Sequence, residues 1–179
     1  RQLAHRPDTV LCATTGIAAV NLGDASTINS LLGYFDTQSL LEKYAIGFLQ
    51  TRLRSLMRSG IRRIVLDEVS MLDGDQLTVL VQALNEVAAT KAYDAELEQV
   101  VEGERDDRRL SLVLVGDFAQ LPPVNAPFAF ESSEWHRFED STFRLRTVRR
   151  QGDVKFVEAL QAVRRGDPDA ALPILKPSF

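Results

Sequence analysis

The chain has 179 residues, of which 45% are hydrophobic and 26% are charged. This size suits one packed domain with part of a second, because a domain averages about 150 residues. The formal net charge of −4 excludes a uniformly basic protein that coats nucleic acid, but it allows a local basic groove. With one cysteine, Cys12, the chain cannot form an internal disulfide, and no apolar run reaches the roughly 20 residues of a membrane helix. We therefore expect a soluble protein of a reducing compartment.

Short apolar segments predict the strands of a buried sheet. Thr9–Ala13, Ile61–Leu66 and Leu110–Val115 are rich in β-branched residues or leucine, and polar or glycine-containing sequence follows each of them. Such runs are typical of strands that are covered on both faces. Phe143–Thr147 predicts a fourth, weaker strand.

Helical periodicity fills the segments between these strands. Leu40–Met57 and Asp75–Ala89 carry apolar residues near a 3.6-residue period. Asp153 is predicted to begin a later helix that Gly166 ends. The acidic span 94–107 predicts a surface excursion. Strands that alternate with helices favour an α/β fold with a parallel sheet.

Ligands of open α/β sheets bind beyond the carboxyl ends of the strands, so the residues that follow each strand are the candidates for chemistry. Ile61–Leu66 is followed by two adjacent carboxylates, Asp67 and Glu68. In a metal–nucleotide site the first could hold Mg²⁺ through water, and the second could orient and deprotonate the attacking water. The alternative is a pair of solvated acids, or acids that cap the next helix.

The strand at Leu110–Val115 leads into the sequence GDFAQLPPV. Gly116 permits a sharp exit from the strand, and the two prolines restrict the loop. We therefore expect Asp117 and Gln120 on a rigid loop beside the acid pair, where the Gln120 amide could contact a γ-phosphate or the attacking water. The alternative is an ordinary loop with structural prolines.

Hydroxyl-rich sequence follows the first strand. Thr14, Thr15 and Gly16 precede a helical pattern, and residues 26–30 repeat the theme. Backbone N–H groups at a helix start can bind a phosphate of a nucleotide or of DNA. The alternative is an ordinary helix cap, in which the hydroxyl serves only the helix.

One nucleotide-binding motif is missing from the sequence. A P-loop has the pattern G-x-x-x-x-G-K-[ST], and its amides and lysine cradle the phosphates. None of the lysines is followed by serine or threonine. The chain as given therefore lacks the main cradle for a triphosphate.

In their order and spacing the motifs resemble the Pif/RecD-like superfamily-one DNA helicases, closest to the Pif branch. ATTGIAAVNLG, STINS, IVLDEVSMLD, LVLVGDFAQLPPV and LRTVRRQGDVKF carry the resemblance, which extends over residues 10–167. It implies a RecA-like motor domain, with a parallel sheet flanked by helices, that uses ATP and Mg²⁺. It also implies movement 5′ to 3′ along single-stranded DNA and unwinding of duplex junctions in DNA repair, recombination or replication. The expected location is the cytoplasm with the nucleoid of a bacterium, or the nucleus or mitochondrion of a eukaryote.

The resemblance also assigns roles to individual residues. Asp67 matches the Mg²⁺ ligand, and Glu68 matches the catalytic base. Gln120 matches the γ-phosphate sensor, and Arg150 matches the arginine finger. Six residues match positions at or near the DNA strand, in a groove where we also expect arginines nearby: Thr14, Thr15, Gly16, Thr27, Asn29 and Ser30.

By the same resemblance, residues 1–151 are part of a first motor domain and residues 152–179 begin a second. The family's P-loop strand would precede Arg1, so we expect the sheet to lack it. Residues 31–50 match the region where the family inserts a small DNA-separating subdomain. The competing hypothesis is a catalytically inactive helicase-like module that binds DNA or a protein partner. The missing P-loop favours it for these 179 residues alone, whereas the intact Asp67, Glu68, Gln120 and Arg150 disfavour it for a longer parent polypeptide. The GDFAQLPPV sequence disfavours a third hypothesis, a nucleotide kinase.

Overall fold

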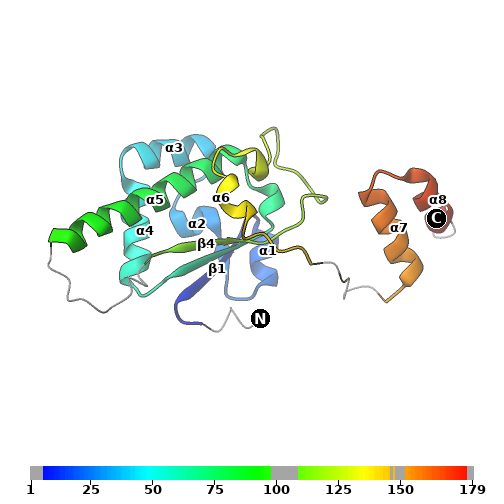
Figure 1. Ribbon diagram of the computed structural model, residues 1–179, viewed down its shortest axis with the longest axis horizontal. Coiled ribbons are helices and arrows are strands. Elements are labelled where there is room, and N and C mark those ends of the chain that lie inside the picture. The colour runs from blue at the N-terminus through cyan, green and yellow to red at the C-terminus, as the bar shows by residue number, and fades with distance from the viewer. Residues whose placement is uncertain (1–5, 98–108, 146, 148–151, 177–179) are drawn as a thin grey trace. The chain divides into compact units, whose positions relative to one another are not determined.

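The computed structural model of the chain describes residues 6–97, 109–145, 147 and 152–176. It divides into two compact units, Arg1–Glu139 and Asp140–Phe179. The first unit contains the sheet (Figure 1). The boundary between motor domains that the sequence predicts after Gln151 lies outside the described residues.

A parallel sheet forms the centre of the first unit. In the part of the chain that the structure describes, its strands follow the order β2 (Ser26–Thr27), β1 (Thr9–Ala13), β3 (Arg63–Asp67) and β4 (Ser111–Leu114). The predicted α/β class and three predicted strands are confirmed. The sequence does not predict β2, because two hydroxyl residues carry no apolar pattern. β4 lies at an edge, and no described strand pairs with its outer side.

The register of the sheet aligns the carboxyl ends of the strands along one edge. Ala13 pairs with Thr27 on one side and with Asp67 on the other. Leu66 in turn pairs with Leu114. Residues that directly follow β1, β3 and β4 are therefore neighbours in space, although they are far apart in the sequence.

Helices flank the sheet in the first unit. They are α1 (Gly16–Asn21), α2 (Ile28–Leu32), α3 (Thr37–Ala45), α4 (Phe48–Arg58), α5 (Gly74–Leu97) and α6 (His136–Glu139), with short 3₁₀ turns at Val69–Met71 and Ala129–Glu131. α3, α4 and α5 pack against one another, and Figure 1 shows α3 and α5 on the same side of the sheet. Much of the region 31–50 is therefore helical, and its role as a DNA-separating insertion stays a prediction.

The prediction of one helix over Leu40–Met57 is wrong. The chain forms α3 and α4 instead, separated at Gly47, whose φ of 75° lies in the left-handed region that glycine adopts without steric penalty. The apolar period continues across this break and conceals it. α5 continues past the predicted end at Ala89, so residues 94–97 of the acidic span are helical, and residues 98–107 of that span lie outside the described residues.

The predicted strand at Phe143–Thr147 is also wrong. Its described residues, 143–145 and 147, have no regular secondary structure. Phe143 and Leu145 are 90% and 95% exposed. A strand is stable only with a pairing partner and a face to bury, and no described strand pairs with this segment.

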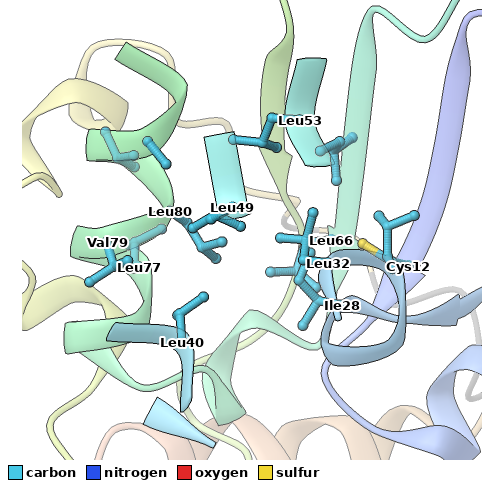
Figure 2. Packing of buried hydrophobic residues seen from close by; sticks show 14 of the residues in the cluster. Cys12, Ile28, Leu32, Leu40, Leu49, Leu53, Leu66, Leu77, Val79 and Leu80 are labelled. Carbon is cyan, nitrogen blue, oxygen red and sulfur yellow. The ribbon is translucent and has the colours of Figure 1, made fainter. Parts of the chain in front are cut away.

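The hydrophobic core lies between the sheet and α2 to α5 (Figure 2). Both central strands and all four of these helices contribute fully buried side chains to it. These members include Cys12, Ile28, Leu32, Leu40, Leu49, Leu53, Leu66 and Leu77. Interiors packed in this way are hard to compress, so the polar residues at the ends of β1 and β3 are held on a rigid frame.

The second unit contains α7 (Val154–Arg164) and α8 (Pro168–Leu175), which pack against each other. The Asp153 carboxylate accepts two backbone N–H groups at 2.9 and 3.2 Å and caps α7. Gly166, with a φ of 71°, follows the end of that helix, as predicted. None of the helices in the described segments combines the length and hydropathy that a bilayer-spanning helix needs.

Candidate functional site

Three chain segments meet at the carboxyl edge of the sheet. The backbone N–H of Thr14, which follows β1, donates to the Asp67 carbonyl at 3.2 Å. The N–H of Val69, which follows β3, donates to the Val115 carbonyl at 3.0 Å. The structure therefore brings together the hydroxyl-rich segment, the acid pair and the loop that begins at Gly116.

Asp67 and Glu68 are half-buried at the end of β3. One oxygen of the Asp67 carboxylate accepts the Glu68 N–H at 3.0 Å. The Glu68 side chain makes no cap bond to the 3₁₀ turn that follows, so the alternative of a helix-capping acid fails for this residue. The backbone of Glu68 has φ 57° and ψ 43°, in the left-handed region that non-glycine residues rarely adopt.

Gly116 lies directly against this strained segment. A Cβ atom at Gly116 would stand 2.8 Å from the backbone nitrogen of Val69, closer than real Cβ atoms come. The glycine is therefore needed for the close approach of two backbones at the acid pair.

The loop after β4 is anchored by its aromatic residue. The Phe118 ring packs edge-on against Phe130 and Trp135, with ring centroids 4.9 and 5.5 Å apart. The Asp117 carbonyl accepts the N–H of Gln120 at 2.9 Å, which folds this part of the loop into a turn. The Gln120 side chain is exposed. The loop that carries Gln120 follows β4, and β4 pairs with β3, the strand that ends at the acid pair. This arrangement agrees with the expected position of the loop beside the acid pair.

Thr15 and Thr27 cap α1 and α2. Thr15 Oγ1 accepts the N–H of Ala18 at 3.2 Å. Thr27 Oγ1 accepts the N–H of Ser30 at 3.1 Å and donates to its hydroxyl oxygen at 2.9 Å. The helix-cap alternative accounts for both threonine hydroxyls, and their contact with DNA stays a prediction. Gly16 is exposed, with open space where a Cβ would stand.

Phe35 is an exposed aromatic residue that the sequence reasoning misses. Its side chain is 87% exposed, although its backbone is held on both sides. Its carbonyl accepts the Nδ2–H of Asn29 at 3.0 Å, and its N–H donates to Ser39 Oγ at 2.8 Å. Gly33 ends α2 and Asp36 caps α3. These two residues are the sequence signal that Phe35 lies in a loop and belongs to the apolar face of neither helix.

The arginines expected near the DNA groove do not include Arg62 or Arg63. Both stand at the amino end of β3, opposite the acid pair. The Arg62 guanidinium donates to the Met57 carbonyl at 2.7 Å, and that of Arg63 donates to Thr9 Oγ1 at 3.2 Å. These side chains therefore serve the fold at that end of the sheet.

Arg150, the predicted arginine finger, lies outside the described residues, so the structure does not place it. In the described segments, no group of three or more His, Cys, Asp or Glu residues could hold a metal ion. The acid pair nevertheless suits Mg²⁺, because that ion is commonly bound by one or two carboxylates together with substrate phosphates.

A parallel sheet with flanking helices, and an acid pair and an anchored glutamine loop at its carboxyl edge, define a RecA-like α/β domain. The chain belongs to the family of PIF1-like helicases, whose family model matches residues 2–172. The resemblance noted in the sequence is therefore confirmed, and the hypothesis of a nucleotide kinase is excluded.

Relatives in yeast and human are similar over most of this chain. The ATP-dependent DNA helicase PIF1 of Saccharomyces cerevisiae (strain YJM789) is 34% identical over 177 residues, which cover 92% of this chain and 18% of the relative. The human ATP-dependent DNA helicase PIF1 is 32% identical over 170 residues, which cover 88% of this chain and 23% of the relative. The chain thus spans about a fifth of the length of these relatives.

Solved structures show the same fold. The crystal structure of Pif1 helicase from Candida albicans has 31% identity and a TM-score of 0.54, over 88% of this chain and 34% of that one. A Bacteroides Pif1 helicase in complex with ADP-AlF3 and single-stranded DNA has 21% identity and a TM-score of 0.58. It covers 92% of this chain and 38% of its own chain, and at that identity the likeness concerns the fold alone.

Proposed function

We propose that this chain is part of an ATP-dependent DNA helicase that moves 5′ to 3′ along single-stranded DNA and unwinds duplex junctions in DNA repair, recombination or replication. The observation that carries the proposal is the meeting of Asp67, Glu68 and the loop 116–120 at one edge of a parallel sheet. Open α/β folds bind their ligands at this edge. The yeast and human relatives are named ATP-dependent DNA helicases, which supports the reaction class.

In this proposal the edge of the sheet serves the nucleotide. Asp67 holds Mg²⁺, which when bound offsets the charge on the phosphates of ATP. Glu68 acts as the base that takes a proton from the attacking water. Gln120 contacts the γ-phosphate from its exposed loop, and Arg150 acts as the arginine finger. The residues that would cradle the remaining phosphates are not part of the given sequence, because it contains no P-loop motif.

We place the DNA strand along the starts of α1 and α2, where Gly16 and Ser30 are exposed, and along the exposed ring of Phe35, which follows α2. Bases stack on aromatic side chains, and the firmly held backbone of Phe35 presents its ring to solvent. The net charge of −4 gives no general attraction for DNA, so binding relies on local groups and falls as salt increases. The other members of this proposed DNA surface are Thr15, Gly16, Thr27, Asn29 and Ser30.

The test uses the natural full-length polypeptide that contains these residues. Glu68→Gln removes the base and keeps the shape, so DNA-stimulated ATP turnover should fall by about 10²-fold or more while ATP still binds. Glu139→Gln makes the same chemical change at an exposed position in α6 and is the matched control. Turnover that is equal in the two variants would rule out Glu68 as the base.

The second candidate function is a helicase-like module that binds DNA or a protein partner without turnover. The observation behind it is that residues 1–179 contain no P-loop motif, which a module without turnover does not need. Such a module would bind single-stranded DNA in a salt-dependent way, yet its full-length polypeptide would hydrolyse no ATP with or without DNA. We propose that either form works where DNA is kept, in a bacterial nucleoid or in a eukaryotic nucleus or mitochondrion.

A further inference from the structure

The strained backbone of Glu68 is fixed by its surroundings. Glu68 and Asn125 are the non-glycine residues with positive φ in the described parts of the chain, and Glu68 is the one that stands at the candidate catalytic position. Such a conformation persists where neighbouring groups hold it in place. The contacts that hold Glu68 therefore also determine where its carboxylate lies.

Each polar group of the two peptide units around Glu68 has a partner. In the first unit, the Asp67 carbonyl accepts the Thr14 N–H at 3.2 Å, and the Glu68 N–H donates to the Asp67 carboxylate at 3.0 Å. In the second unit, the Glu68 carbonyl accepts the Thr14 hydroxyl at 2.9 Å and the Met71 N–H at 3.1 Å, and the Val69 N–H donates to the Val115 carbonyl at 3.0 Å. Thr14 thus supplies two of these five contacts, one from its backbone and one from its side chain.

Thr14 also adjoins the proposed DNA surface. It is followed by Thr15 and Gly16, which begin α1, and Gly16 is exposed with open space around it. A ligand that shifts the backbone at Thr15 and Gly16 also acts on Thr14, whose hydroxyl is hydrogen-bonded to the Glu68 carbonyl. The Thr14 hydroxyl donates to the Glu68 carbonyl, so this side chain has a partner at the acid pair besides its predicted position near the DNA strand.

We propose that Thr14 is a positioning residue that couples the DNA surface to Glu68. Its hydroxyl transmits the position of the Thr15–Gly16 backbone to the Glu68 carbonyl and so sets the orientation of the Glu68 carboxylate when DNA binds. The coupling rests on the proposed function, since it assumes that Glu68 acts in ATP turnover and that α1 begins at the DNA strand.

The test compares three variants of the natural full-length polypeptide. Thr14→Val keeps the shape and removes the hydroxyl, whereas Thr14→Ser keeps the hydroxyl. Thr78→Val is the control for the loss of a half-buried threonine hydroxyl: the Thr78 hydroxyl donates to the Gly74 carbonyl at 3.0 Å and also lies 2.8 Å from the Ser132 hydroxyl. For each protein, ATP turnover is measured without DNA and with saturating single-stranded DNA, together with the Kd for that DNA.

We expect Thr14→Val to lower DNA-stimulated kcat by about tenfold or more, a part of what a well-placed base contributes. The loss should be larger with saturating DNA than without it, and Thr14→Ser and Thr78→Val should resemble the wild type. A weakened Kd with normal kcat at saturating DNA would make Thr14 a DNA ligand and overturn the coupling. An equal loss with and without DNA, or a loss in Thr14→Ser as large as in Thr14→Val, would overturn it too.

Failure of the proposed function is recognised separately. If the wild type hydrolyses no ATP under any condition, Glu68 is not a base in turnover, but the mechanical coupling can still be measured. Hydrogen exchange of the Glu68 and Val69 amides should change when single-stranded DNA is added to the wild type, and this change should vanish in Thr14→Val. Exchange at these amides that DNA leaves unchanged in the wild type overturns the proposal whatever the turnover.

Discussion

The close approach of β3 and β4 at Gly116 leads to a stability prediction for Gly116→Ala. The added methyl carbon would stand 2.8 Å from the nitrogen of Val69, 3.0 Å from its Cγ1 and 3.4 Å from the Glu68 carbonyl carbon. Carbon atoms prefer separations of about 3.5 Å or more, so the two chain segments must move apart by several tenths of an ångström. The hydrogen bond from the Val69 N–H to the Val115 carbonyl, 3.0 Å long, joins these two segments and should weaken when they move apart.

Overpacking of this kind costs about 1–3 kcal/mol. For a chain of this size, about 1 kcal/mol corresponds to about 2–4 °C in Tm, so Gly116→Ala should lower Tm by about 2–12 °C. Gly152→Ala is the control, because nothing lies within 4 Å of a Cβ at Gly152. Thermal unfolding of the purified chain, followed by circular dichroism, measures both variants. Equal Tm values for the two would show that the segments do not approach each other this closely.

Further predictions concern three other residues. Phe35→Ala should weaken single-stranded DNA binding by about 1–3 kcal/mol, because one stacking base loses its platform, and fluorescence anisotropy with a labelled oligonucleotide should detect the loss; an unchanged Kd places the DNA elsewhere. Backbone and side-chain hydrogen bonds from Ser39 lower the pKa of Asp36 in the folded chain. The ionised Asp36 therefore stabilises the fold fully above the pKa of an aspartate in the unfolded chain, and this stabilisation is lost as the pH falls through the lower pKa of the folded chain. In urea unfolding, the free energy of unfolding of Asp36→Ala should lie below that of the wild type at neutral pH and approach it in acid. Burial raises the pKa of the Cys12 thiol to about 12, so a thiol reagent at pH 8 should label Cys12 only after denaturation, and rapid labelling of the folded chain would contradict its burial.

The strands of the central sheet could be predicted because their signal is local. Thr9–Ala13, Ile61–Leu66 and Leu110–Val115 are apolar runs that need burial, and the structure pairs them side by side. The parallel arrangement then gathers the residues after each strand, which is why the acid pair and the glutamine loop could be expected at one edge. The break at Gly47 could not be predicted from periodicity, because apolar residues continue on both sides of it.

The features of the site that the sequence reasoning missed depend on contacts between side chains and backbone. Gly33 and Asp36 mark the loop that contains Phe35, but the hydrogen bonds of Asn29 and Ser39 to its backbone are seen only in the structure. The missed strand β2 is visible only through its pairing with β1. Sequence patterns thus identified which segments lie together in the fold. The contacts between those segments determine whether each side chain is exposed or buried and which groups it contacts.

Glu68 shows why this distinction matters for function. No local preference places a glutamate in the left-handed region, and the sequence around it reads as an ordinary strand end. The conformation results from Thr14 on one side and Val115 on the other, two residues that are themselves fixed by neighbouring strands of the same sheet. Violations of local preference that the surrounding fold enforces occur most often at functional sites. The strain at Glu68 is therefore an independent observation, besides the resemblance of motifs, that supports the proposal of Glu68 as the base.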